Sequence, residues 1–243
     1  MDGYRSWSSA LRDHHRSLLK GLIEIANVDQ SWKRGNQIRL ETLLWGGDEI
    51  LWVMPAWKGW EVAKWFFDQT HNVQGHELTY GCGLVFCHAK APIRNIIELA
   101  HRLGDLTKGA IDGQNVHRLA YEVLESYDDI SGDLDNHRRR FLPASQNISD
   151  LSINPSHLAA CWDVLQRIAS SSDFPMRQLY MLTKKWRKGE DFAQHEKRLK
   201  NACEDAGANV QHLLSTLGDP IAWLHLLQML PYLPVPAVMG DDS

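Results

Sequence analysis

A chain of 243 residues, 44% hydrophobic and 23% charged, has ordinary globular composition and is long enough for one large domain or a domain with an extension. The formal net charge of −4 excludes a surface that attracts nucleic acid everywhere, so any contact with nucleic acid must be local. The spacing of the four cysteines fits neither a zinc knuckle nor a disulfide framework, which indicates free thiols in a reducing compartment.

The N-terminal sequence MDGYRSWSSALRDHH has no apolar core and is not typical of a signal peptide. The most apolar stretch, IAWLHLLQMLPYL, is interrupted by His225 and Gln228 and is too short to cross a bilayer. We therefore expect a soluble cytoplasmic protein without a membrane partner.

Apolar residues recur at helical spacing over residues 6–26, which predicts a helix. Two apolar runs follow, at residues 38–45 and 50–54, on either side of Gly46 and Gly47. A glycine pair supplies the positive φ of a tight turn, so these runs predict a β-hairpin. Residues 58–69 then predict a second helix.

A third strand is predicted over residues 77–88, where Gly81 and Gly83 indicate a bend or the close approach of another backbone. Pro92 opens a helix that runs to about residue 108, and residues 116–126 predict a fourth strand. This order of elements indicates an α+β domain with an antiparallel or mixed sheet and helices on one face.

Beyond about residue 130 no strand is evident, and three or four helices are predicted near residues 155–170, 174–187, 190–216 and 219–230. We therefore divide the chain into an α+β domain at 1–130, a helical region at 131–231 and a flexible tail at 232–243. Five of the ten tryptophans crowd around the hairpin, which favours a core or an interface, with stacking on bases as the alternative: Trp45, Trp52, Trp57, Trp60 and Trp65.

The hairpin sequence LLWGGDEILWVMP resembles the hairpin motif of palm-type nucleotide cyclases and polymerases. These include the GGDEF diguanylate cyclases and the second palm domain of the large polymerase-like subunit of type III CRISPR effector complexes. The strand in LTYGCGLVFCHAKAPI and the helix IRNIIELAHRLGDLTKG, which ends at Lys108, are similar to elements of the same family. The turn with His88, Lys90 and Pro92 resembles the CRISPR branch. The resemblance covers residues 1–127 and is diffuse beyond them.

The resemblance implies a palm/ferredoxin-like antiparallel sheet and nucleotidyl transfer or cyclisation of nucleoside triphosphates with Mg or Mn. Asp48 and Glu49 would be the metal ligands and catalytic residues, since Mg²⁺ takes carboxylate oxygens and substrate phosphates. Phosphates would contact the bare glycine backbone and the lysine charges at four residues: Gly46, Gly47, Lys90 and Lys108. Further partners would be RNA or other subunits of an effector complex.

Each of these residues also has an ordinary structural interpretation. The GGDE segment can be a solvated turn, Lys108 can be a helix end favoured by the helix dipole, and His88 can be a polar residue at a strand end. Glu41 lies among apolar strand residues, so it is an exposed edge residue, a partner of Arg39 or, as a third option, a metal ligand.

A palm of this type begins with a further strand, which carries another aspartate ligand, but only Asp2 precedes the first predicted helix. The chain would then be part of a longer protein, half of a split one, or a degenerate palm, and each option predicts an exposed sheet edge. The alternative function is a non-catalytic palm-like scaffold or an RNA-associated interaction subunit. A third possibility is an unrelated α+β protein with a coincidental turn.

Two short basic clusters, HRRRF at 137–141 and KKWRKG at 184–189, have the composition of RNA-contacting patches or of solvated helix faces. The second cluster interleaves Trp186. The remaining histidines of interest lack matching cysteines or acids at metal-ligand spacing: His14, His15, His71 and His76. A Walker A loop and the hydrolase motif GxSxG are absent from the sequence.

Overall fold

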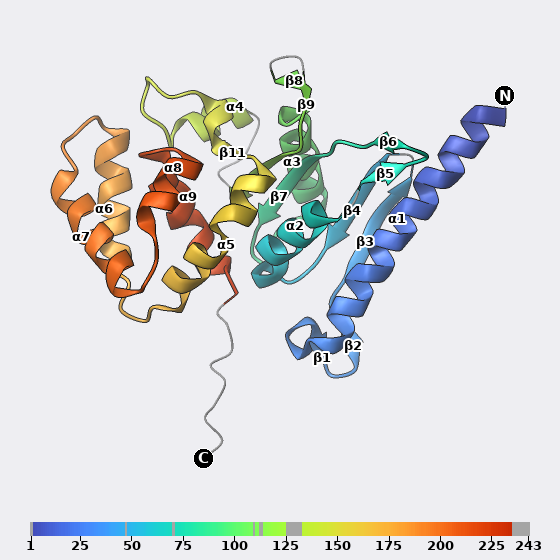
Figure 1. The fold of residues 1–243 in the computed structure, drawn as a ribbon, viewed down its shortest axis with the longest axis horizontal. Helices are drawn as coiled ribbons and strands as arrows, with labels where there is room; N and C mark the ends of the chain where they lie inside the picture. The colour runs from blue at the N-terminus through green and yellow to red at the C-terminus, as the bar shows by residue number, and fades with distance from the viewer. Residues whose placement is uncertain are drawn as a thin grey trace. The chain divides into compact units, whose positions relative to one another are not determined.

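The computed structural model describes residues 2–46, 48–69, 71–108, 110–111, 114–124 and 133–234. The chain divides into two compact units, Met1–Thr79 and Tyr80–Ser243 (Figure 1). The boundary predicted near residue 130 lies outside the described residues, as does most of the predicted tail, residues 235–243. In the part that the structure describes, no helix is long and apolar enough to cross a bilayer.

The first unit has two helices and six short strands among its described residues: α1 (Asp2–Val28), β1 (Lys33–Arg34), β2 (Gln37–Ile38), β3 (Glu41–Gly46), β4 (Glu49–Val53), α2 (Gly59–Asp68), β5 (Asn72–Val73) and β6 (His76–Glu77). Both predicted helices and the predicted hairpin are confirmed. Gly46 is the last residue of β3 and pairs with Glu49 across the hairpin, so Gly46 belongs to the paired strands rather than to the turn.

The core of the first unit forms where α1 meets α2 and the turn that follows α1. Leu18, Leu22 and Ala26 are buried on α1, and their spacing of four residues puts them on one helix face. Leu22 and Ala26 pack with Trp32 and Val62, and partly buried side chains surround this group: Ile38, Leu40, Trp52, Met54 and Trp65. The helical periodicity of residues 6–26 therefore reflects a real buried stripe.

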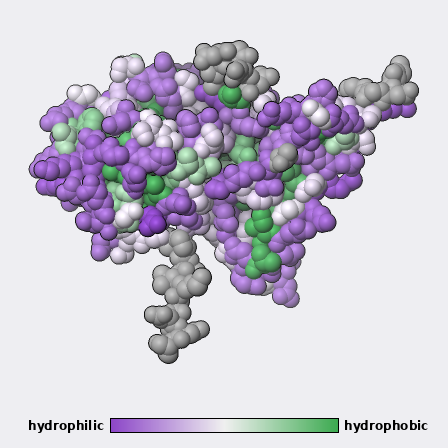
Figure 2. Space-filling model, in the orientation of Figure 1, coloured by the Kyte–Doolittle hydropathy of each residue, from purple (hydrophilic) through white to green (hydrophobic). Residues whose placement is uncertain are grey.

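Most tryptophans near the hairpin serve the core. Trp60 is fully buried, Trp45, Trp52 and Trp65 are partly buried, and Trp57 is 42% exposed. The guanidinium of Arg39 lies 4.7 Å from the centre of the Trp57 ring, so the exposed indole already has a cation over it. Elsewhere the visible surface is mostly polar, with smaller apolar areas (Figure 2).

The second unit begins with a small sheet and continues into helices: β7 (Gly81–Phe86), α3 (Ile93–Leu106), β8 (Ala110–Ile111), β9 (Gln114–Asn115), β10 (Arg118–Val123), α4 (Leu134–Arg139), β11 (Ser152–Ile153), α5 (Pro155–Ser170), α6 (Met176–Arg187), α7 (Ala193–Asp205), α8 (Val210–Leu217) and α9 (Ile221–Met229).

The three-stranded sheet of this unit has the order β11-β10-β7 and is mixed. Strand β10 runs parallel to β7, with Arg118 opposite Gly81 and Val123 opposite Phe86, and antiparallel to β11. The order of elements allowed an antiparallel or a mixed sheet, and the mixed one is confirmed, whereas the antiparallel sheet implied by the resemblance is wrong for this unit. The reason is that α3 lies between β7 and β10 in the chain and returns it to the end of the sheet where β7 began.

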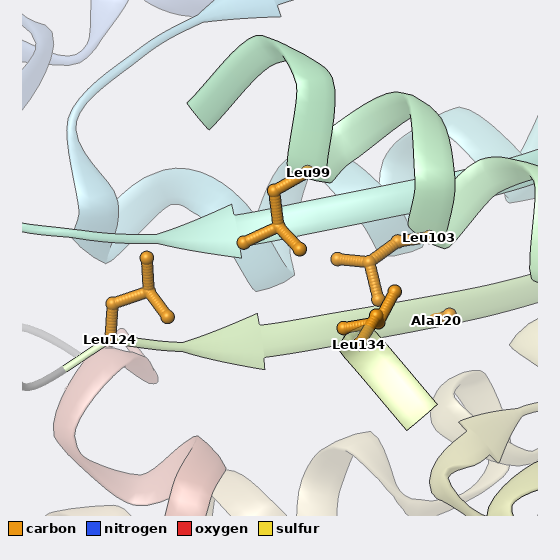
Figure 3. Close-up of a cluster of buried hydrophobic side chains, with 5 residues drawn as sticks. All are labelled: Leu99, Leu103, Ala120, Leu124 and Leu134. Carbon is orange, nitrogen blue, oxygen red and sulfur yellow. The ribbon is translucent and has the colours of Figure 1, made fainter. Parts of the chain in front are cut away.

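Helix α3 packs directly on β7 at the two glycines of that strand. A Cβ built on Gly83 would lie 2.0 Å from the Ala100 carbonyl oxygen, and one on Gly81 would lie 2.5 Å from Oγ1 of Thr107. The close backbone approach predicted at these glycines is confirmed. Five buried side chains complete this layer (Figure 3): Leu99, Leu103, Ala120, Leu124 and Leu134.

The helical C-terminal region is confirmed, with five helices from α5 to α9. The single helix expected over 190–216 is two, α7 and α8, and Gly207 lies between them with φ +65°. The short strand β11 was not expected. It pairs with β10 through Ile153 and Ser152, opposite Leu119 and Ala120, and so ties the helical region to the sheet of its own unit.

Candidate functional site

The two acids of the hairpin lie at its solvent-exposed tip. Asp48 is in the turn and Glu49 is the first residue of β4. Both are exposed, and neither side chain has a hydrogen bond or ion pair to another described residue. A Cβ on Gly46 would meet no atom within 4 Å, so the backbone here is open to a ligand. Gly47, the other predicted phosphate contact, lies outside the described residues.

The acidic tip is close to α1 of the same unit. His15 on α1 is 1% exposed and meets the ring of Trp45 edge-on, with centroids 6.4 Å apart. Burial lowers the pKa of His15, the neighbouring His14 lowers that pKa further, and the negative charge of Asp48 acts in the opposite direction. His15 is therefore neutral at neutral pH, so it does not neutralise the negative charge of Asp48.

A metal bound at this tip would need ligands beyond the residues that the structure describes. Among the described residues, no three His, Cys, Asp or Glu side chains gather closely enough to hold an ion. Mg²⁺ commonly takes only one or two protein carboxylates and completes its shell with water and substrate phosphates. Asp48 and Glu49 fit that role in number and in exposure.

The two lysines predicted to contact phosphate belong to the second unit, whereas the acids belong to the first. Lys108 is exposed and pairs with Asp105 at 2.8 Å, which lowers the pKa of Asp105. Lys90 is also exposed. Helix α3 separates the two lysines, and its 14 residues span about 21 Å, so they do not serve the same phosphate.

His88 and Glu41 have structural surroundings. The backbone N–H of Lys90 donates to Nδ1 of His88 at 3.2 Å, so His88 stabilises the turn before α3. Glu41 is exposed at the opposite end of the hairpin, where it pairs with Val53. The suggested partner Arg39 instead donates to the carbonyl of Ser31 at 2.9 Å.

Each basic cluster is only partly at the surface: Arg139 and Arg140 of the first and Arg187 and Lys188 of the second are exposed. His137 and Arg138 of the first cluster are 6% and 1% exposed. Trp186 of the second is 7% exposed and packs in a core cluster with Leu142, Leu151, Ile221 and Leu224. The RNA-patch reading and the solvated-face reading are therefore both wrong for His137, Arg138 and Trp186.

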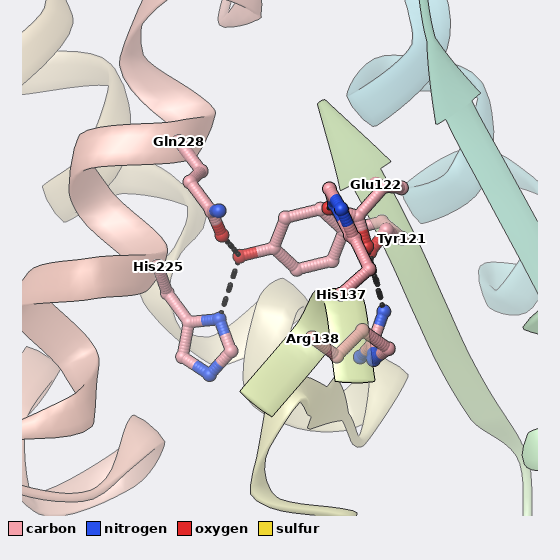
Figure 4. A network of polar contacts seen from close by, with 6 residues as sticks. All are labelled: Tyr121, Glu122, His137, Arg138, His225 and Gln228. Atoms are coloured by element: carbon pink, nitrogen blue, oxygen red, sulfur yellow. Dashed lines mark hydrogen bonds and ion pairs between the residues drawn. The ribbon is translucent and has the colours of Figure 1, made fainter. Parts of the chain in front are cut away.

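The buried residues of the first cluster belong to a polar network that was not expected (Figure 4). Oε1 of Glu122 lies 3.1 Å from Nε2 of His137, and its Oε2 lies 3.2 Å from Nη1 of Arg138. The same Nη1 donates to the carbonyl of Tyr121 at 2.9 Å. Nε and Nη2 of Arg138 are buried with no hydrogen-bond partner among the described residues, and burial lowers the pKa of the guanidinium.

The same network continues from Tyr121 on β10 to helix α9. The Tyr121 hydroxyl lies 2.7 Å from Nδ1 of His225 and donates to Oε1 of Gln228 at 3.0 Å. Burial lowers the pKa of His225 to about 4, so its ring is neutral at neutral pH. The signal in the sequence was a lone histidine and a glutamine inside the otherwise apolar segment IAWLHLLQML, but their partner on β10 is about 100 positions away.

In the first unit, a buried lysine that the sequence did not single out joins two elements. Nζ of Lys58 is 2.5 Å from Asp29, which follows α1, and 2.8 Å from Glu61 on α2. Burial alone would raise the pKa of Asp29, but the bonds from Lys58 and Ser31 bring it down to about 2. This triad is a structural clamp between the end of α1 and the start of α2.

Comparison of the chain with protein-family models, with curated proteins and with solved structures finds no match in any of the three.

Proposed function

We propose that the tip of the β3–β4 hairpin binds a nucleoside triphosphate with Mg²⁺ or Mn²⁺, as part of a palm-type nucleotidyltransferase or nucleotide cyclase-like domain of the type III CRISPR large-subunit kind. The observation that carries this proposal is the tip itself. Asp48 and Glu49 are exposed and uncommitted to other described residues, beside the open backbone of Gly46. Such a tip can present carboxylates and bare backbone to a metal and its triphosphate.

In this proposal Asp48 and Glu49 hold the metal, and Gly46 and Gly47 let the phosphates approach the backbone. The bound metal would neutralise phosphate charge and favour attack of a 3′-hydroxyl on an α-phosphate. Burial lowers the pKa of His15, so this residue is neutral at neutral pH and adds no positive charge beside the acidic tip.

The order of the elements also supports the proposal. Helix α1, the hairpin, helix α2, strand β7, helix α3 and strand β10 follow one another in the order that the resemblance implies after the first palm strand. Gly81 and Gly83 of β7 lie against α3, and they correspond to the small residues that the resemblance expects in this strand. This succession accounts for the described part of residues 1–124 without assigning a function to the helices α5 to α9.

A variant series on the hairpin tests the proposal. Binding of ATP and GTP is measured with Mn²⁺ for the wild-type chain and for the Asp48→Ala, Glu49→Ala double variant. Glu41→Ala is the matched control, because Glu41 is an exposed acid at the other end of the same hairpin. The proposal predicts metal-dependent binding that the double variant loses and the control keeps. Equal binding by all three proteins would reject it.

A second candidate is a non-catalytic palm-like scaffold or RNA-associated subunit. It is favoured by the open strand edges of the described residues: β3 and β4 pair only with each other, and β7 pairs only with β10. Unpaired edges accept strands from partners. Nucleotide binding without product formation, or binding of RNA or a protein partner that survives the Asp48→Ala, Glu49→Ala change, would favour this candidate.

A further inference from the structure

Two histidines that are far apart in the sequence meet in the first unit. His14 lies on α1 and His71 directly precedes β5, 57 positions later. Nε2 of His14 and Nδ1 of His71 are 3.4 Å apart, and the two rings meet edge-on at 82°. Helix α1 and β5 are in contact, so the fold itself brings the two imidazoles together.

The tautomer of His71 is fixed by its other nitrogen. Nε2 of His71 is 2.8 Å from the carbonyl oxygen of Phe66. A carbonyl oxygen can only accept a hydrogen bond, so Nε2 carries the proton and Nδ1 presents its lone pair. Nδ1 is the atom that faces His14. A backbone carbonyl that orients an imidazole through its distal nitrogen is the usual outer partner of a metal-binding histidine.

His71 is also held rigidly. It is 5% exposed, and its ring packs against Phe66 with centroids 4.7 Å apart. His14 is half-buried, and burial lowers its pKa. The His14 ring is therefore available in the neutral form that a metal ion requires at neutral pH.

The separation of the two nitrogens suits a shared ion better than a shared proton. A separation of 3.4 Å is longer than a normal hydrogen bond, which ends near 3.2 Å. Zn²⁺ binds imidazole nitrogen at about 2.0–2.1 Å, so two such ligands at a tetrahedral angle lie about 3.4 Å apart. Binding would only require the His14 proton to move from Nε2 to Nδ1, with no change in its net charge.

We propose that His14 and His71 form a two-histidine site for a borderline transition-metal ion such as Zn²⁺ or Co²⁺. No third His, Cys, Asp or Glu joins them among the described residues, so water or a small anion completes the coordination shell. The site is separate from the carboxylate tip in its donor atoms, because imidazole selects these ions and carboxylate selects Mg²⁺.

The test uses the full chain without an affinity tag, stripped of metal by a chelator and titrated with Co²⁺ and Zn²⁺. Visible absorption of Co²⁺ and the heat of Zn²⁺ binding report the site. We expect one equivalent to bind, with affinity reduced at least about tenfold by His14→Ala and by His71→Ala. His157→Ala, at an exposed histidine of the second unit, should bind like the wild type.

A further variant, His14→Gln, guards against loss of folding. Its amide can still donate a hydrogen bond to Nδ1 of His71 but is a poor metal ligand. Wild-type thermal stability together with at least about tenfold weaker binding would support the site. Absence of binding by the wild type, or binding that none of the changes at His14 and His71 weakens, would overturn it.

Discussion

Glu122 and Arg138 form an ion pair inside the second unit, with side chains that are only 3% and 1% exposed. A buried pair of this kind is strongly destabilising to break, because the remaining charge stays buried without its partner. We therefore expect Arg138→Ala to lower the free energy of unfolding by about 3–5 kcal/mol in urea denaturation. The exposed neighbour Arg139 is the matched control, and Arg139→Ala should cost about 1 kcal/mol or less. Similar losses for the two variants would contradict the buried pair.

The buried His225 predicts a stability that depends on pH. Its folded pKa is about 4, below the ordinary value of 6.5, so between these values the unfolded chain binds more protons than the folded one. Stability from this group is therefore complete above pH 6.5 and is lost as the pH falls toward 4, by up to about 3 kcal/mol.

His14 and His15 have lowered pKa values and act in the same direction, so the His225 contribution has to be isolated by substitution. We expect His225→Asn to flatten the dependence of unfolding free energy on pH between 6.5 and 4.5, measured by urea titrations at several pH values. An unchanged slope in the variant would show that His225 titrates normally in the folded chain.

The Lys58 clamp predicts a second loss of stability on acidification, in a lower pH range than that of His225. The folded pKa of Asp29 is about 2, below its ordinary 3.8, so the clamp stabilises the fold above pH 3.8 and weakens as the pH falls toward 2. Both carboxylates are about one-third exposed, which screens the interaction. Lys58→Ala should cost about 1–3 kcal/mol at pH 7, whereas Lys64→Ala, at a more exposed pair, should cost less than about 1 kcal/mol. Equal losses would argue against the clamp.

Substitution by alanine should destabilise the protein strongly at one glycine and hardly at all at another. Gly83→Ala would place a Cβ 2.0 Å from the Ala100 carbonyl oxygen, so it should cost about 3 kcal/mol or more, or prevent folding. Gly46→Ala meets open space and should leave the melting temperature within a few degrees of the wild type. If Gly46→Ala folds normally yet weakens nucleotide binding, the loss reports contact between backbone and phosphate. A stable Gly83→Ala protein would contradict the packing of α3 on β7.

Local patterns predicted those elements whose partners are close in sequence. Leu18 and Leu22 recur at helical spacing and are both buried, so part of the buried face of α1 was visible in advance. The hairpin was visible because two apolar runs flank a glycine pair. Gly81 and Gly83 indicated a close backbone contact, although the sequence did not show that α3 would supply it.

The remaining features depend on contacts between distant residues. HRRRF has the composition of a surface patch, and only the position of Glu122 on β10 makes burial of His137 and Arg138 possible. The parallel pairing of β7 with β10 follows from the crossover through α3, which composition does not encode. His14 and His71 were set aside for lack of spacing, because their proximity arises from the packing of α1 on β5.

The central claim is that Asp48 and Glu49 hold a metal that binds nucleotide, and its most direct test is the metal dependence of ATP and GTP affinity. Titrations of the wild-type chain are compared with Mn²⁺ and with a chelator, and then repeated with the Asp48→Ala, Glu49→Ala variant at confirmed native thermal stability. The proposal predicts binding that requires Mn²⁺ and that falls at least about tenfold in the variant. Absence of binding, or binding that is the same with chelator or in the variant, would contradict it.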